Sequence, residues 1–329
     1  MDKLSLRLGA PLIRLLGNAI ARHAGDDRLC IISYHRILER PDPLIDSEPT
    51  VDTFRWHMDL LKACFNVLPL AQAIELLKEG RLPPRAIAIT FDDGYRSLHE
   101  LALPILRERG LPATVFVTSG HIADSSSMWN DIILEAVRRL PGPAVDLADL
   151  GLERYPLDTP AARKTSAGLL TEHCKYLSPT ARAAMLARLR ELAGHDLTQH
   201  LMLTPAMIRD LAANGVDIGG HTVTHPILEK LDDASAAREI ADCKHELEAI
   251  TGRPVRLFAY PNGKAGTDFT GRHLDMVRAA GYDAAFTTAT GAATSSHSLY
   301  AFPRSRPWDV RPLPFAARLL QWLHGARHG

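Results

Sequence analysis

The feature that most constrains the fold is a regular alternation of short apolar runs with longer helical patterns. Seven runs rich in Ile, Val, Phe and Thr are predicted strands: 29–34, 86–91, 113–118, 216–219, 255–260, 284–288 and 299–302. A weaker strand candidate lies at 65–68. Strands that alternate with helices favour a parallel sheet with right-handed crossovers. Seven such units predict an α/β fold, a distorted seven-stranded (β/α) barrel.

One stretch interrupts this alternation between the third and fourth predicted strands. Residues 122–203 are mostly helical in pattern, with helices predicted at 129–140, 161–170 and 179–193 and an irregular loop at 142–160. We interpret 122–203 as a helical insertion over one face of the barrel, not as an independent domain. The predicted organisation is an N-terminal amphipathic helix at 1–28, the barrel at 29–310 with this insertion, and a C-terminal amphipathic helix at 311–329.

Polar residues follow the end of every predicted strand. They are His35, Asp92 and Asp93, His121, His221 and His225, the run 260–263, Thr287 and Thr288, and Arg304, Arg306 and Trp308. In a barrel of parallel strands the C-terminal strand ends meet on one rim, and active sites lie there. We therefore expect these residues to surround one site.

Two motifs on this rim predict a hydrolytic metal site. Residues 90–94 read Thr-Phe-Asp-Asp-Gly, and residues 220–225 read Gly-His-Thr-Val-Thr-His. One Asp and two His would leave a divalent ion open for water, and the second Asp could accept that water's proton. Alone, the first motif also fits a turn and the second fits two surface histidines. Their joint occurrence after apolar strands favours the catalytic interpretation.

These two motifs, together with the run Phe-Ala-Tyr-Pro-Asn-Gly at 258–263, resemble those of the polysaccharide deacetylases. That family shares the NodB homology domain and forms carbohydrate esterase family 4. The segments 33–36 and 281–288 are similar to a bacterial branch of it. The resemblance covers residues 29–308 apart from the insertion, and it implies a (β/α)-barrel hydrolase that removes N-acetyl groups from amino sugars with zinc or a similar ion.

The resemblance also implies roles for individual residues. Asp93, His221 and His225 correspond to the metal ligands, and Asp92 corresponds to the general base. A backbone N–H near Asn262 would hold the oxyanion, with Pro261 making the turn rigid, and Thr222 would support the histidine loop. The residues expected to contact substrate are Tyr260, Pro261, His35 and Trp308.

The sequence departs from the family pattern at two points. Ala259 stands where the family usually carries an arginine that contacts the base, and we expect Arg304 or Arg306 to replace it. The family's late Leu-x-x-His, the usual general acid, is not evident, so the acid is unassigned.

We therefore predict a metal-dependent carbohydrate N-deacetylase that acts on a poly- or oligosaccharide, including a lipid-linked one. The same site could serve a deacylase or deformylase of a non-polysaccharide amide, and a glycan-binding homologue without turnover is the third alternative. Zinc is the expected ion, with cobalt, nickel and manganese as alternatives, because two imidazoles and a carboxylate accept all of them.

Composition limits the partners and the compartment. Lys+Arg and Asp+Glu both number 38, so the sequence gives no electrostatic reason to expect nucleic acid. The four scattered cysteines fit buried thiols in a reducing compartment.

Residues 1–24 lack the uninterrupted apolar core of a secretory signal, which favours a cytoplasmic protein. Both terminal helices are leucine-rich with basic flanks, so they either cap the barrel or contact the inner face of the membrane peripherally.

Overall fold

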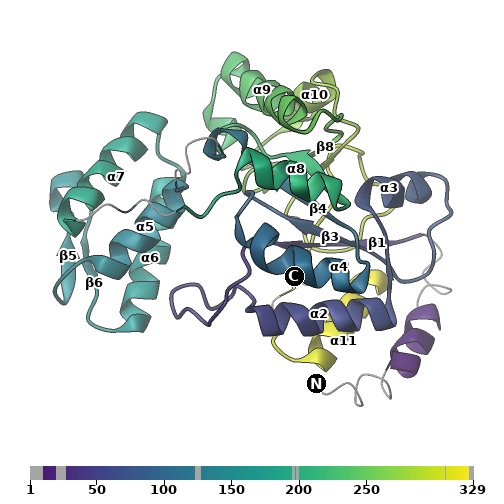
Figure 1. Ribbon diagram of the computed structural model, residues 1–329. Helices are drawn as coiled ribbons and strands as arrows, with labels where there is room; N and C mark the ends of the chain where they lie inside the picture. The colour runs from purple at the N-terminus through teal and green to yellow at the C-terminus, as the bar shows by residue number, and fades with distance from the viewer. Residues whose placement is uncertain are drawn as a thin grey trace.

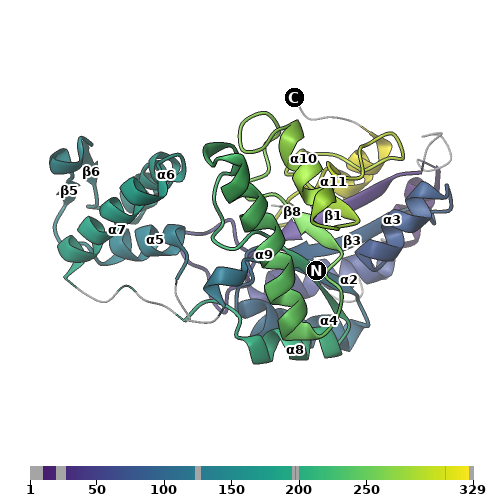
Figure 2. The same cartoon turned by 90° about the horizontal axis from the view of Figure 1, so that it is seen from above.

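The computed structural model describes residues 10–19, 27–122, 127–194, 197, 200–307 and 309–325. Its centre is a curled parallel sheet with helices outside it (Figures 1 and 2). The strands are β1 (Leu29–Tyr34), β3 (Ala86–Phe91), β4 (Ala113–Val117), β7 (Val216–Gly220), β8 (Leu257–Ala259) and β9 (Ala284–Phe286), hydrogen-bonded in that order. The short β2 (Asn66–Val67) pairs with β3 in parallel, as expected from the weaker strand candidate.

The sheet closes through the segment that follows β9. Phe302 forms a parallel bridge with Phe286 of β9, and Ser305 forms one with Ile32 of β1. The predicted seventh strand at 299–302 does contact β9: the Ala285 N–H donates to the Leu299 carbonyl oxygen, and the Phe302 N–H donates to the Ala285 carbonyl oxygen, but no regular ladder forms. Pro303 has no N–H to donate to a ladder, so single bridges replace a regular strand. The predicted distorted (β/α) barrel is confirmed.

The helices between the strands follow the predicted pattern. They are α2 (Val51–Cys64), α3 (Leu70–Lys78), α4 (Leu103–Arg109) with the π-helical turn η1 (Leu98–Ala102) before it, α8 (Pro205–Ala213), α9 (Asp233–Thr251) and α10 (Gly271–Ala279). Single-turn 3₁₀ segments are η2 (Ser119–His121), η3 (Ala148–Leu150) and η4 (Leu228–Lys230). Thr50, Thr204 and Asp232 cap α2, α8 and α9 by accepting a backbone N–H with the side chain.

Alternate strand residues form two apolar layers. Leu29, Ile31 and Phe116 belong to the cluster that fills the barrel, whereas Cys30 and Ile32 belong to the cluster beneath the outer helices. Helix α3 packs on the inner cluster, and it lies on the side of the body away from the insertion (Figure 1). Because β1, β3 and β4 are buried along their whole length, they appear in the sequence as continuous apolar runs. All four cysteines are buried and free.

The insertion has a hydrophobic cluster of its own. It contains α5 (Trp129–Arg139), β5 (Ala144–Asp146), β6 (Arg154–Pro156), α6 (Pro160–Lys175) and α7 (Pro179–Ala193). Both ribbon views place it to one side of the barrel. The antiparallel pairing of β5 with β6 corrects the expectation of an irregular loop at 142–160. Strands of three residues are too short to show a period, so no sequence pattern predicts them.

The described parts of both terminal helices pack on the barrel. In the helical segment 10–19, Ala10 and Ile13 contact the outer core, while Leu12, Leu15 and Leu16 are exposed. Helix α11 (Pro312–His324) buries six residues: Phe315, Ala316, Leu319, Leu320, Trp322 and Leu323. Within the described residues, no helix is both long enough and apolar enough to cross a bilayer.

Candidate metal centre and active site

Residues from four separated parts of the chain meet at the C-terminal ends of the strands. Asp92 and Asp93 follow β3, and His221 to His225 follow β7. Asn262 follows β8, and Arg304 lies in the segment that closes the sheet. This is the rim on which the sequence placed them, and parallel strand ends account for the convergence.

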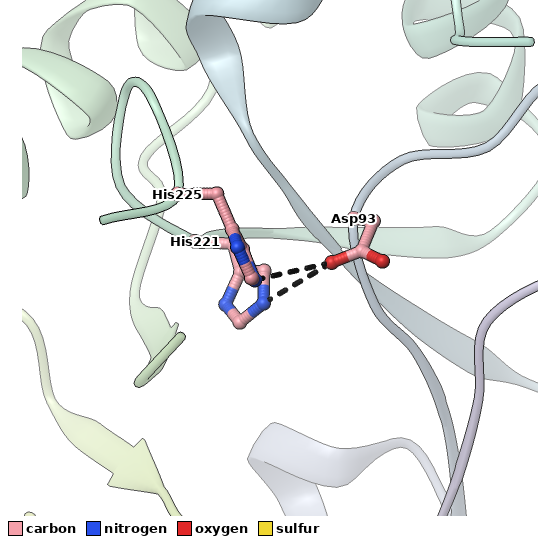
Figure 3. Close-up of side chains that lie close together, drawn as sticks. All are labelled: Asp93, His221 and His225. Carbon is pink, nitrogen blue, oxygen red and sulfur yellow. Dashed lines mark ion pairs between the residues drawn. The ribbon is translucent and has the colours of Figure 1, made fainter. Parts of the chain in front are cut away.

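Asp93, His221 and His225 form a compact set of donor atoms. Their potential ligand atoms all lie within 4.8 Å of one another, and all three residues are buried. Asp93 Oδ1 lies 3.4 Å from His221 Nε2 and 3.5 Å from His225 Nε2 (Figure 3). The two imidazole centroids are 4.9 Å apart. The three side chains thus converge on one point.

The backbone of the site is unusual. Four non-glycine residues have left-handed conformations: Asp93 (φ 71°), Thr222 (φ 67°), His225 (φ 55°) and Asn262 (φ 59°). Such conformations cost energy for residues with a Cβ, and they persist where the surrounding structure fixes them. Here they turn the chain sharply after β3, β7 and β8, so that the side chains point to the common site.

The histidine loop is braced on both sides. His221 Nδ1 lies 2.7 Å from the carbonyl oxygen of Ala259, which leaves Nε2 free to face Asp93. The His225 N–H donates to Thr222 Oγ1 at 3.1 Å, as expected for a residue that supports the loop. The Glu239 carboxylate on α9 accepts the N–H groups of Val223 and Thr224 at 2.8 Å. No sequence motif points to Glu239.

Two glycines permit the close approach of neighbouring elements. A Cβ on Gly120 would lie 2.7 Å from the carbonyl oxygen of Val223, so η2 could not contact the histidine loop. A Cβ on Gly220 would lie 2.2 Å from the Tyr282 hydroxyl oxygen. The histidine loop therefore depends on small residues in β7 and η2.

Asp92 has a different partner from Asp93. Arg304 donates to both carboxylate oxygens of Asp92, at 2.6 and 2.9 Å, and both side chains are buried. Burial acts to raise the pKa of Asp92, but Arg304, His221 and His35 outweigh it and hold the pKa below its usual value. The sequence left Arg304 and Arg306 as candidates for the arginine beside the base, and Arg304 is the one that contacts Asp92. Arg306 instead pairs with Glu48 at 2.6 Å.

The surroundings of His225 and Asp93 favour the deprotonated form of each at neutral pH. Burial lowers the pKa of His225 to about 3, although the charge of Asp93 acts in the opposite direction. Burial acts to raise the pKa of Asp93, but the hydrogen bond with His221 and the charge of His225 outweigh it, so the pKa lies below its usual value. A carboxylate and neutral imidazoles are the forms that bind a divalent cation.

The donor set fits a divalent transition metal. Two imidazole nitrogens and one carboxylate oxygen are ordinary zinc ligands, and three protein ligands leave a coordination position for water or substrate. The contact of His221 Nδ1 with Ala259 supplies the outer hydrogen bond that metal-binding histidines usually make.

A cavity of about 300 Å³ lies over this set. Of the predicted substrate-contacting residues, His35 and Tyr260 line it, and so does Asn262. The Tyr260 hydroxyl donates to the Tyr300 carbonyl oxygen, so only the remainder of this side chain is available to a ligand. Pro261 is buried in the turn. Trp308 lies outside the described residues.

The insertion supplies the wall that sequence reasoning missed. Its lining residues are Trp129, Asn130, Thr171, Glu172 and Lys175. None of these five residues belongs to the sequence motifs. They lie on helices remote in sequence from the two motifs, so only the packing of the insertion on the barrel reveals them.

Comparisons with known proteins agree with this architecture. A sequence model described as "Polysaccharide deacetylase" matches residues 79–149 and 170–285, more than half of the chain. The chain is 20% identical to YxkH of Bacillus subtilis over 279 residues, which are 85% of this chain and 71% of YxkH. It is 36% identical to the poly-beta-1,6-N-acetyl-D-glucosamine N-deacetylase of Staphylococcus aureus over 66 residues, 20% of this chain and 23% of that enzyme.

Two solved structures illustrate the shared fold. Streptococcus pyogenes deacetylase PplD, in complex with acetate, superposes with a TM-score of 0.59 at 19% identity, covering 91% of this chain and 99% of PplD. IcaB from Ammonifex degensii superposes with a TM-score of 0.58 at 18% identity, covering 91% of this chain and 98% of IcaB. At these identities the likeness establishes the fold.

Proposed function

From the premise that this chain belongs to the polysaccharide deacetylase family, we propose that it is a metal-dependent hydrolase that removes N-acetyl groups from amino sugars of a poly- or oligosaccharide. One observation carries the proposal: two adjacent buried carboxylates have different partners. Asp93 faces His221 and His225, whereas Asp92 is held by Arg304. The short match to a poly-N-acetylglucosamine deacetylase supports an N-acetylated amino sugar as the substrate.

The residues divide into a binding set and a reacting set. Asp93, His221 and His225 would hold the ion. When bound, a divalent cation polarises the amide carbonyl and makes bound water more acidic. Zinc suits two imidazoles and a carboxylate, and cobalt, nickel and manganese are the alternatives.

Asp92 is placed to accept a proton from the attacking water. Its lowered pKa keeps it ionised at neutral pH, and the two hydrogen bonds from Arg304 fix its orientation. The Asn262 N–H donates no hydrogen bond to any described residue, and Asn262 lines the cavity, so this N–H is available to the developing oxyanion.

His35 is the proposed proton donor to the departing amine. It lines the cavity outside the ligand set, and its buried Nδ1 has no hydrogen-bond partner among the described residues. A His35→Gln variant that keeps full kcat throughout the neutral pH range would exclude this role.

The test is acetate release from purified protein. Short β-1,6- and β-1,4-linked N-acetylglucosamine oligomers should release acetate, a chelator should stop the reaction, and added zinc should restore it. His221→Ala and His225→Ala should lose the metal and the activity while circular dichroism shows an intact fold.

The alternatives give different results in the same assay. Oligomers that bind without releasing acetate would indicate a glycan-binding protein without turnover. Release from simple N-acyl or N-formyl amides, with none from oligomers, would indicate a deacylase or deformylase. Activity that persists in chelator would contradict metal dependence, and full metal content in either histidine variant would contradict the ligand set.

A further inference from the structure

The insertion forms one wall of the cavity, and the metal-site residues line the same cavity. Trp129 and Asn130 come from α5, and Lys175 comes from the last turn of α6. A substrate that reaches the metal site must therefore lie beside the insertion. The polar groups on this wall decide which substituents the sugar can carry.

The wall is fixed in place by ionic contacts with the barrel. The Asp131 carboxylate on α5 receives the Tyr95 hydroxyl at 3.1 Å and lies 3.4 Å from an Arg36 nitrogen. Farther along the insertion, Arg138 pairs with Asp42 at 2.6 Å and Lys164 pairs with Asp46 at 2.7 Å. Contacts at both ends of α5 and at the start of α6 keep the wall at a set position.

Lys175 is a cation without a counter-charge. Its side chain lines the cavity, the residue is only 8% exposed, and within the described chain its ammonium has no ion pair within 4.0 Å. The ammonium lies 5.1 Å from the centre of the Tyr176 ring, which partly offsets its desolvation. By comparison, the buried Arg304 and Arg109 both pair with carboxylates. An ammonium without an ion pair, on a side chain that is otherwise buried at the cavity wall, favours an anion that enters the cavity.

Arg182 on α7 contacts both the end of α6, where Lys175 lies, and the Trp129 ring. It donates to the carbonyl oxygens of Cys174 and Lys175 at 3.3 and 3.0 Å, and its guanidinium lies 4.8 Å from the Trp129 ring centre. These contacts satisfy carbonyl groups at the end of α6. The position of Lys175 is therefore determined before any ligand arrives.

The same wall keeps two further polar atoms unpaired. Trp129 Nε1 and Asn130 Oδ1 are buried and have no hydrogen-bond partner among the described residues. Trp129 Nε1 can donate to an oxygen of an anionic group, and Asn130 Oδ1 can accept from a sugar hydroxyl. Both atoms lie on the wall that carries the Lys175 ammonium, and small side-chain adjustments would bring them to a ligand. Glu172, one turn before Lys175, is exposed and makes no ion pair with it within 4.0 Å.

We propose that Lys175 makes the cavity selective for an amino sugar that carries an anionic substituent, a phosphate or a carboxylate, near its N-acetyl group. On the metal side the Asp92 charge is matched by Arg304, whereas Lys175 has no ion pair among the described residues and is available to the substrate. This inference rests on the proposed deacetylase function, because it assigns the class of sugar that the same cavity accepts.

Calorimetry on the full-length, metal-loaded protein tests the proposal. The ligands are N-acetylglucosamine, N-acetylglucosamine 1-phosphate and N-acetylmuramic acid, which are neutral, phosphorylated and carboxylated. Wild type should bind at least one anionic sugar roughly 10- to 100-fold more tightly than the neutral sugar. Lys175→Met should abolish the difference, and Lys175→Arg should retain most of it. The stronger of the two anionic ligands identifies the substituent.

Lys78→Met is the matched control, because Lys78 is a half-exposed lysine on α3, away from the cavity. It should leave all three affinities unchanged. Equal affinity of wild type for neutral and anionic sugars, or no measurable binding of any of them, would overturn the proposal. An equal loss for all three ligands in Lys175→Met would assign Lys175 a structural role instead. Because calorimetry registers binding without turnover, missing acetate release would count against the deacetylase function alone.

Discussion

Asp92 and Asp93 are neighbours in the sequence and both are buried, yet their side chains have different partners. Asp93 lies among imidazoles, and Asp92 lies against a guanidinium. We predict that Asp92→Asn retains the metal but loses ~10²–10⁴-fold in kcat, the usual contribution of a general base. Asp93→Asn should weaken metal binding first. Metal content by atomic absorption, measured beside kcat, distinguishes the two, and equal metal loss in both variants would refute the division.

Arg304 gives a second prediction at this scale. Removing it in Arg304→Met leaves Asp92 as a buried carboxylate without its counter-charge, which costs roughly 3–5 kcal/mol of folding stability. In wild type the lowered pKa means that this carboxylate stabilises the fold above its unfolded pKa, and the contribution is lost as pH falls through the folded pKa. Loss of Arg304 should raise the pKa of Asp92, so the acidic limb of the pH–rate profile moves to higher pH.

The measurements are urea unfolding and kcat/KM as a function of pH. Arg306→Met is the control, because Arg306 pairs with Glu48 and does not contact Asp92. If both variants have the same pH–rate profile as wild type, Arg304 does not tune the base.

Sequence reasoning succeeded at the residues whose chemistry is local. Asp93, His221 and His225 lie in two short motifs after buried strands, so their convergence follows from the strand order. The sequence narrowed the arginine beside Asp92 only to Arg304 or Arg306. Which of the two faces inward depends on the path of the segment that closes the sheet. Glu239 and Lys175 had no local signal, since their roles arise from the packing of α9 and α6 on the site.

At the scale of elements, predictability followed burial and length. Strands β1 and β3 are buried on both faces and matched the predicted ranges. Three-residue strands such as β5 and β6 have no detectable period, and β8 and β9 are shorter than the apolar runs that contain them. The insertion is attached by side-chain ion pairs and by one isolated backbone bridge, Tyr95 with Met202, rather than by a regular sheet, so the sequence could place its helices but not its orientation.

The attachment of α5 through Asp131 should respond to pH. Burial raises the pKa of Asp131 to about 6, against the opposing charge of Arg36, so the folded protein binds this proton more tightly than the unfolded chain. The folded protein therefore loses stability as pH rises from about 4 to about 7, by roughly 2–3 kcal/mol from this group. Asp131→Asn should lack that dependence in urea unfolding.

Asp42 is a control for Asp131, because its pKa is shifted in the opposite direction. Burial acts to raise the pKa of Asp42, but the hydrogen bond and charge of Arg138 outweigh it, so the pKa is lowered. Relative to Asp42→Asn, wild type should gain stability as pH rises through the acidic range. Parallel pH profiles for wild type and Asp131→Asn would contradict the assignment for Asp131.

For the whole molecule, the open question in the sequence was whether the leucine-rich termini cap the barrel or contact a membrane. The described N-terminal segment packs one face on the barrel, where Arg14 donates to the Ala63 carbonyl oxygen at 2.6 Å. Its opposite face leaves Leu12, Leu15 and Leu16 between 49% and 67% exposed. One helix can therefore pack on the barrel with one face and contact a membrane with the other. We propose that the protein is cytoplasmic and attaches peripherally to the inner face of the membrane, close to a lipid-linked glycan.

The exposed leucines make this proposal testable without disturbing the packed face. Replacing Leu12, Leu15 and Leu16 with Ser should reduce sedimentation with anionic phosphatidylglycerol vesicles, while turnover of a soluble oligosaccharide stays within twofold of wild type, or roughly 0.4 kcal/mol. Leu169→Ser is the matched control, because Leu169 is 56% exposed on the insertion. Vesicle binding unchanged by the triple replacement would exclude this surface as the membrane contact.

The left-handed backbone at Asp93 and His225 has a consequence for how this protein can evolve. Glycine at either position would relax the chain by an amount of order 1 kcal/mol, yet it would delete a donor atom that the reaction needs. A population selected only for resistance to heat would therefore drift toward glycine there and become inactive. Directed evolution of a hardier variant must apply a demand for catalysis in every round, and its stabilising substitutions have to accumulate away from these turns.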